Sequence, residues 1–138
     1  MPKLSQSVVP MQQVPQPNHG PINPPMTVEE VRQTPYNISA AFEWVDVDIY
    51  NEEWAQKVYT LLLENYVEDD DNMFRFDYSV PFLRWALTPE GYRTDWHVGV
   101  VVKATGKLVG FISGIPAKLN VYDSKIDVAE INFLCVHK

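Results

Sequence analysis

The sequence predicts an α/β or α+β unit in which helices cover one face of a mainly antiparallel sheet. Two helical patterns come first, at residues 51–66 and after Ser79, and four strand-like segments follow at residues 97–103, 107–115, 118–122 and 127–137. The loops between these segments are short, and short loops join antiparallel neighbours. Helices followed by such a strand series bury their apolar faces as two packed layers.

The helical patterns have recognisable ends. Asn51 is a residue type that caps a first turn, and apolar side chains follow it at helical spacing up to Leu62. Ser79 is expected to cap the second helix, and Pro89 is expected to stop it.

Composition narrows the class of protein. The chain of 138 residues is 46% hydrophobic and has a net charge of −7, which favours a packed core and disfavours nucleic acid as a partner. One cysteine cannot form an internal disulfide, and three histidines without paired spacing indicate no metal site. No apolar run approaches the roughly 18–20 residues of a membrane span, and no signal peptide is evident, so the expected location is cytoplasmic.

The composition changes near residue 35. Residues 1–35 contain eight of the eleven prolines and no aromatic residue. Proline cannot donate a backbone hydrogen bond, so this segment is expected to be a disordered or strap-like arm. The folded domain is expected at residues 36–138.

An acidic run lies between aromatic residues. Glu68 is followed by three aspartates, and the spacing of the run does not fit a calcium-binding loop. A solvated loop is the simplest interpretation of a charge run. The flanking apolar and aromatic side chains favour a groove that pairs carboxylates with a cation instead: Tyr66, Val67, Met73, Phe74, Phe76 and Tyr78, with Arg75 among them.

The last strand-like segment is unusual because Glu130 and Asn132 interrupt its apolar residues. The segment is either an edge strand with polar residues facing solvent, or a strand whose pairing opens and leaves backbone N–H groups available to a carbonyl oxygen. Cys135 and His137 alternate along this strand; a thiol–imidazole pair is conceivable, but packing is the more usual role of a cysteine in an apolar strand.

These stretches resemble a known family. Residues 65–76 (NYVEDDDNMFRF) and 130–138 (EINFLCVHK) are similar to two signature stretches in the N-terminal half of eukaryotic N-myristoyltransferases, and the resemblance extends over residues 36–138. It implies a GNAT-like (acyl-CoA N-acyltransferase) fold, of which this chain would be the incomplete first half of a duplicated pair. It also implies transfer of myristate from myristoyl-CoA, as co-substrate and without a prosthetic group, to the N-terminal glycine of protein substrates, often with a nearby lysine.

The resemblance also implies site residues. The backbone N–H groups of Phe133 and Leu134 would form the oxyanion hole, and Asn132 would lie beside the reacting glycine. Cys135 and Val136 would belong with Phe133 and Leu134 to the acyl-CoA-binding strand. The peptide groove would be lined by Tyr66, Val67, Asp69, Asp71, Phe74, Arg75 and Phe76.

Two parts of the family pattern have no counterpart in residues 1–138. These are the basic turn that binds the CoA pyrophosphate and the C-terminal carboxylate that acts as general base. The chain alone is therefore expected to be inactive. The alternatives are a catalytically inactive truncated product, a peptide-binding module, or half of a generic GNAT-like acetyltransferase.

Overall fold

The computed structural model describes residues 21–67 and 74–138. The chain divides after Arg32 into two units, which are described separately. In the first unit, residues 27–30 form a turn in which the Thr27 backbone N–H donates to the Glu30 carboxylate at 2.8 Å. The second unit contains the helices and the sheet.

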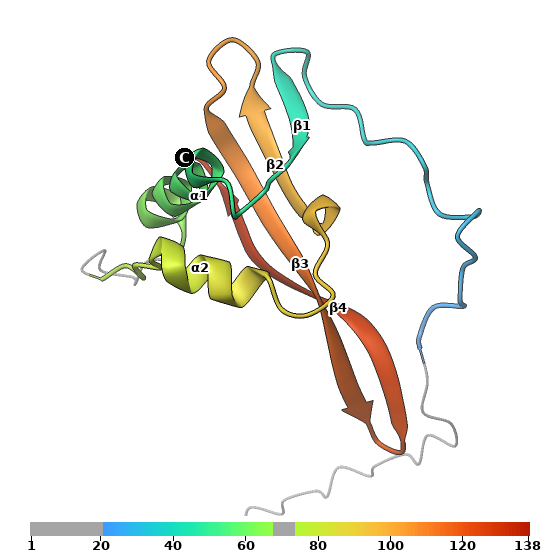
Figure 1. The fold of residues 1–138 in the computed structure, drawn as a ribbon. Coiled ribbons are helices and arrows are strands. Elements are labelled where there is room, and N and C mark those ends of the chain that lie inside the picture. The colour runs from blue at the N-terminus through green and yellow to red at the C-terminus, as the bar shows by residue number, and fades with distance from the viewer. Residues whose placement is uncertain (1–20, 68–73) are drawn as a thin grey trace, which may run out of the picture. The chain divides into compact units, whose positions relative to one another are not determined.

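One four-stranded antiparallel sheet forms the centre of the second unit. Its strands are β1 (Phe42–Asp46), β2 (His97–Val102), β3 (Leu108–Val121) and β4 (Ser124–Val136), and they lie side by side in chain order. Helices α1 (Glu52–Asn65) and α2 (Val80–Leu87) pack on the same face of this sheet (Figure 1). A single 3-10 turn, η1 (Thr94–Trp96), leads into β2. The expected two-layer arrangement with an antiparallel sheet is confirmed.

Both predicted helix caps are confirmed. The Asn51 side chain accepts a hydrogen bond from the Trp54 backbone N–H at 3.1 Å, and the Ser79 hydroxyl accepts one from the Phe82 backbone N–H at 3.4 Å. Each cap satisfies one of the donors that the first turn leaves without a partner inside the helix.

The strand boundaries differ from the prediction in three places. β1 was not predicted, and its alternation is weak because only two of its five side chains are half-buried. The segments expected at 107–115 and 118–122 are one strand, β3, which runs through Pro116. The pairing of β3 with β2 extends only as far as Ser113 of β3. Pro116 therefore lies where β3 has no β2 neighbour, and the missing N–H of the proline is tolerated there. β4 begins at Ser124 rather than Asp127 because pairing with β3 extends almost to the hairpin turn.

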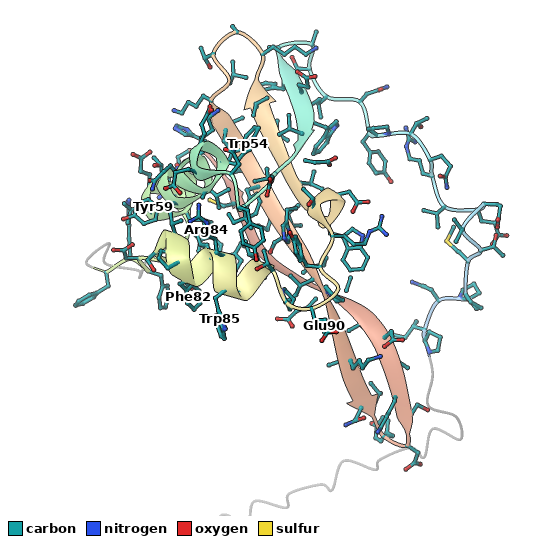
Figure 2. The ribbon with its side chains drawn as sticks, viewed as in Figure 1. Trp54, Tyr59, Phe82, Arg84, Trp85 and Glu90 are labelled. Atoms are coloured by element: carbon teal, nitrogen blue, oxygen red, sulfur yellow. The ribbon has the colours of Figure 1, made fainter. Side chains whose placement is uncertain are left out.

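The core lies between the helices and the sheet. Its buried side chains are Val47, Ile49, Ala55, Val58, Leu61, Leu62, Leu83, Leu87, Val101, Leu108, Phe111, Phe133 and Cys135. Arg84 on α2 ties the helices to the chain that leaves β1 (Figure 2): its guanidinium donates to the Ile49 carbonyl at 3.1 Å and to the Glu52 carboxylate at 2.6 Å. These contacts join α2 to the start of α1 and to the loop between β1 and α1.

Candidate active site at the interrupted strand β4

The pairing of β4 with β3 is interrupted at one point. The register shifts between Phe111 and Ser113, so that Phe133 and Leu134 both stand opposite Ile112. One extra residue in one strand of an antiparallel pair is a β-bulge, which bends the strand and breaks the ladder locally. β4 is also the edge strand of the sheet, and Glu130 and Asn132 are exposed, as the first alternative expected; the bulge adds a local break in pairing at Phe133 and Leu134.

Phe133 has a backbone conformation that is unusual for its residue type. Its φ is +55°, and such a conformation costs on the order of 1–3 kcal/mol for a residue with a side chain. Two features offset this cost. The Phe133 ring is buried and lies 5.9 Å from the ring of Tyr66 and 5.2 Å from that of Tyr78, and the Phe133 backbone N–H donates to the Asn132 side-chain oxygen at 2.8 Å.

The bulge reverses the side-chain alternation of β4. Directly before it, Asn132 lies on the same face of the sheet as its partner in the register, the buried Ser113. After it, Phe133 and Cys135 face the helices and are buried, whereas Leu134 and Val136 are each 66% exposed. The bulge thus decides which side chains of the candidate acyl-CoA strand enter the core.

Ser113 was not predicted to belong to the site. Its side chain is 1% exposed, and its hydroxyl donates to the Asn132 backbone carbonyl at 3.0 Å, next to the interrupted ladder. The signal in the sequence is a hydroxyl residue at a core-facing position of an otherwise apolar strand (LVGFISGI). Buried hydroxyls need a hydrogen-bond partner, so such a residue indicates a polar group within reach in the core.

An aromatic cluster adjoins the bulge. The Tyr78 ring contacts four other rings, at centroid distances of 5.2–6.0 Å: those of Tyr66, Phe76, Phe82 and Phe133. Phe82 and Trp85 project from the surface of α2 (Figure 2), and Phe76 is exposed as well. This cluster connects two of the predicted peptide-groove residues, Tyr66 and Phe76, with the bulge.

The remaining predicted groove residues are placed as follows. Val67 and Phe74 are exposed. The Arg75 guanidinium donates to the backbone carbonyl of Glu64 at 3.0 Å, in the last turn of α1. Asp69 and Asp71 lie outside the described residues, so the acidic side of the groove is not placed.

Cys135 packs in the core. Its side chain is 4% exposed, and its sulfur lies 3.7 Å from the Leu61 carbonyl oxygen. Burial raises the pKa of the Cys135 thiol. A thiol nucleophile requires access and a lowered pKa, so this environment favours the packing role that the sequence suggested as the more usual one.

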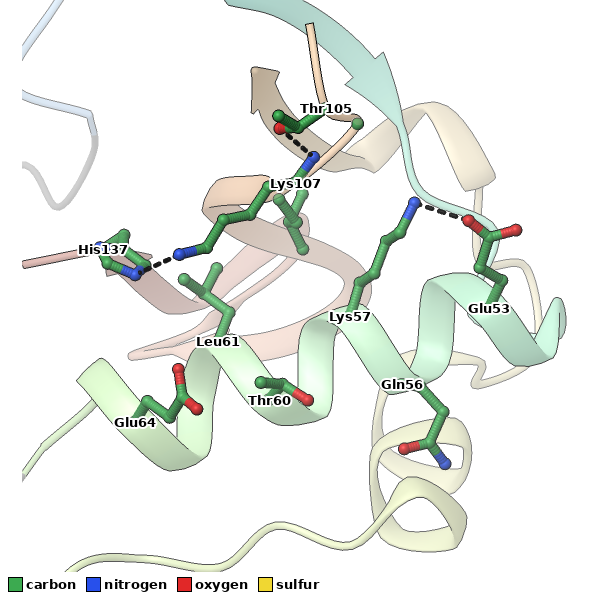
Figure 3. A pocket seen from close by; sticks show the side chains of 11 residues that line it. Glu53, Gln56, Lys57, Thr60, Leu61, Glu64, Thr105, Lys107 and His137 are labelled. Carbon is green, nitrogen blue, oxygen red and sulfur yellow. Dashed lines mark hydrogen bonds and ion pairs between the residues drawn. The ribbon is translucent and has the colours of Figure 1, made fainter. Parts of the chain in front are cut away.

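A separate groove lies between α1 and the β2–β3 turn (Figure 3), with a volume of about 390 Å³. Lys107 Nζ lies 2.7 Å from His137 Nε2. His137 Nδ1 lies 2.6 Å from the Lys138 carbonyl oxygen. On the opposite wall Lys57 pairs with Glu53 at 2.7 Å. The groove contains none of the predicted site residues.

In the described ranges, residues 21–67 and 74–138, no three histidine, cysteine, aspartate or glutamate side chains gather in a metal-binding arrangement. Over the same ranges, no helix is both long and apolar enough to cross a membrane.

The described fold is of the α/β class: two helices cover an antiparallel sheet whose last strand is interrupted beside an aromatic cluster. Residues 21–138 match the family model described as myristoyl-CoA:protein N-myristoyltransferase, N-terminal domain. The chain belongs to this family, as the sequence resemblance indicated.

Relatives and solved structures agree with this membership. Glycylpeptide N-tetradecanoyltransferase 1 of Arabidopsis thaliana is 55% identical over 119 residues, which is 86% of this chain and 27% of the relative. Glycylpeptide N-tetradecanoyltransferase 2 of Danio rerio is 54% identical over all 138 residues and 26% of its own length. The Saccharomyces cerevisiae N-myristoyltransferase structure with bound myristoyl-CoA superposes with a TM-score of 0.80 at 49% identity, covering 86% of this chain and 28% of that one. The chain spans about a quarter of the length of these relatives.

Proposed function

We propose that this chain forms the acyl-CoA-binding part of an N-myristoyltransferase, which transfers myristate from myristoyl-CoA to the N-terminal glycine of protein substrates. The observation that carries the proposal is the bulge at Phe133 and Leu134 in a chain of this family. A similar structure, at 49% sequence identity, was solved with myristoyl-CoA bound.

The chemistry requires a donor for a developing negative charge. When the glycine amine attacks the thioester carbonyl carbon, the carbonyl oxygen becomes an oxyanion; the C–S bond then breaks, and CoA leaves as the thiol while the nitrogen loses a proton. A backbone N–H aimed at such an oxygen is worth about 3–4 kcal/mol of barrier. We assign this role to the N–H groups of Phe133 and Leu134, with Cys135 and Val136 continuing the acyl-CoA-binding strand.

Asn132 has two tasks in this scheme. Its side-chain oxygen accepts the Phe133 N–H at 2.8 Å, so it must rotate away before a thioester oxygen can accept the same hydrogen. The rotated amide then lies next to the place where the amine reacts. The thioester oxygen of the substrate is therefore proposed to replace the Asn132 side-chain oxygen as the acceptor of the Phe133 N–H.

The peptide groove is proposed to be lined by Tyr66, Val67, Asp69, Asp71, Phe74, Arg75 and Phe76. The exposed rings at 74 and 76 would supply apolar walls. The aspartates would face a lysine of the peptide, and the net charge of −7 would favour the approach of a cationic substrate. We propose a cytoplasmic location, where nascent chains with a free N-terminal glycine arise. We also propose that residues 1–35 form a disordered or strap-like arm.

The direct test compares the 138-residue chain with a chimera that adds the C-terminal remainder of the Danio rerio relative. Each is given myristoyl-CoA and a glycine-initiated peptide that carries a lysine; the control peptide has an acetylated N-terminus. The chimera is expected to acylate only the free glycine, and the 138-residue chain is expected to be inactive. An inactive chimera, or one that acylates both peptides equally, would contradict the proposal.

A second experiment tests the acidic side of the groove. In the chimera, Asp69→Asn and Asp71→Asn are expected to raise KM several-fold for the lysine peptide and less for a peptide with norleucine in its place, because charged hydrogen bonds are worth about 1.5–3 kcal/mol. Asp70→Asn is the matched control. Equal effects of the three substitutions on KM would contradict the proposal that Asp69 and Asp71 line the peptide groove, and would favour a solvated loop.

A further inference from the structure

The bulge in β4 is held from the neighbouring strand by one side chain. The Ser113 hydroxyl donates to the Asn132 carbonyl at 3.0 Å, directly before the point where the ladder shifts. Ser113 is 1% exposed and comes from β3, on the face that the helices cover. Its side chain therefore lies in the interior, next to the bulge.

Asn132 is consequently fixed at two atoms. Its carbonyl oxygen accepts from Ser113, and its side-chain oxygen accepts from the Phe133 N–H. In the next residue, φ is +55°, a conformation that persists only where its surroundings hold it. When the Asn132 side chain leaves the Phe133 N–H, the hydrogen bond from Ser113 is the one of these two that remains.

We propose that Ser113 is a positioning residue for acyl transfer, which holds the Asn132 backbone so that the Phe133 and Leu134 amides keep their orientation while the Asn132 side chain moves. The catalytic part of this inference rests on the proposed function; the structural part does not. Ser113 acts through Asn132 and has no contact with the reacting atoms.

The structural part is tested in the 138-residue chain by NMR. Ser113→Ala removes the donor, Ser113→Thr keeps it, and Ser124→Ala removes a hydroxyl from the same β3–β4 hairpin far from the bulge. With Ser113→Ala, the Phe133 amide is expected to exchange with solvent about fivefold to tenfold faster, and its HN–Hα coupling is expected to change. Ser113→Thr and Ser124→Ala are expected to stay within twofold of the parent chain.

The catalytic part is tested in the chimera by steady-state kinetics. Ser113→Ala is expected to lower kcat at least tenfold while KM for the peptide changes less than threefold, because the amide donors matter most when charge develops. Ser113→Thr is expected to restore most of kcat. Should Ser113→Ala fail to fold, Ser113→Cys replaces it, since a thiol fills the same space and is a weak donor.

The outcomes separate the two proposals. An inactive parent chimera would count against the proposed function, whereas the NMR result would still decide whether Ser113 holds the bulge. Unchanged exchange and coupling of Phe133 in Ser113→Ala would overturn the inference. Altered NMR parameters with an unchanged kcat would leave Ser113 a purely structural residue and overturn its positioning role.

Discussion

Asn132 and Phe133, neighbours in β4, are joined by a hydrogen bond of 2.8 Å from the Phe133 backbone N–H to the Asn132 side-chain oxygen. The donor is the same N–H that is proposed to receive the thioester oxygen. The site therefore satisfies its own donor, and the side chain that does so is also proposed to lie beside the reacting amine.

This hydrogen bond is expected to stabilise the bulge. Asn132→Ala should lower the free energy of unfolding by about 1 kcal/mol, because it removes the Asn132 acceptor of the Phe133 N–H and leaves only the contact of that backbone with the Tyr66 hydroxyl. Asn132→Asp keeps an acceptor at the same place and should cost less. Urea titrations of the 138-residue chain measure both values; a greater loss for Asp than for Ala would argue against the hydrogen bond.

His97 is expected to make stability depend on pH. Its side chain is fully buried, Nε2 lies 2.7 Å from the Leu87 carbonyl oxygen, and Nδ1 has no hydrogen-bond partner among residues 21–67 and 74–138. Burial lowers the pKa of His97 in the folded state. The unfolded chain therefore takes up a proton near pH 6.5 before the folded chain does, and stability falls as the pH falls below that value.

The measurement is the free energy of unfolding between pH 8 and pH 5. One proton gives a slope of at most about 1.4 kcal/mol per pH unit. His97→Gln should remove this slope, although it lowers stability at every pH. A variant that keeps the full slope would show that other groups cause the dependence.

Cys135 is expected to react slowly with thiol reagents. Burial against α1 and a raised pKa both keep the thiol protonated and covered. Ellman's reagent should label the native chain at least tenfold more slowly than the chain in urea, and Cys135→Ala in the chimera should retain transferase activity. Rapid labelling of the native chain, or loss of transfer in Cys135→Ala with the fold intact, would restore the nucleophile interpretation.

Arg75 is expected to stabilise the end of α1. Its guanidinium donates to the Glu64 carbonyl at 3.0 Å, where the negative end of the helix dipole favours a cation. Arg75→Met should lower stability by about 0.3–1 kcal/mol and speed amide exchange in the last turn of α1, whereas Arg75→Lys should do less. If Arg75 contacts only the peptide substrate, Arg75→Met will change KM for the peptide in the chimera but will leave amide exchange in the last turn of α1 unchanged.

Local signals were sufficient to predict the helices. Asn51 and Ser79 cap helices because their side chains bond backbone donors three residues away, which is a property of neighbouring residues. β1 and the continuity of β3 through Pro116 were missed, because an edge strand and a tolerated proline both depend on which neighbour is absent.

The sequence by itself determined the two helices and the strand-forming segments after residue 97, since these depend on residue types and spacing, and its resemblance to the family indicated the membership and the candidate site residues. Only the tertiary structure decided which face each residue of β4 occupies. Strict alternation would have put Asn132 and Leu134 on one face, but the bulge places Phe133 and Cys135 in the core. The physical reason is that a bulge depends on contacts between segments far apart in the chain, here the burial of Phe133 against Tyr66 and Tyr78 and the hydrogen bond from Ser113 that is proposed to hold Asn132.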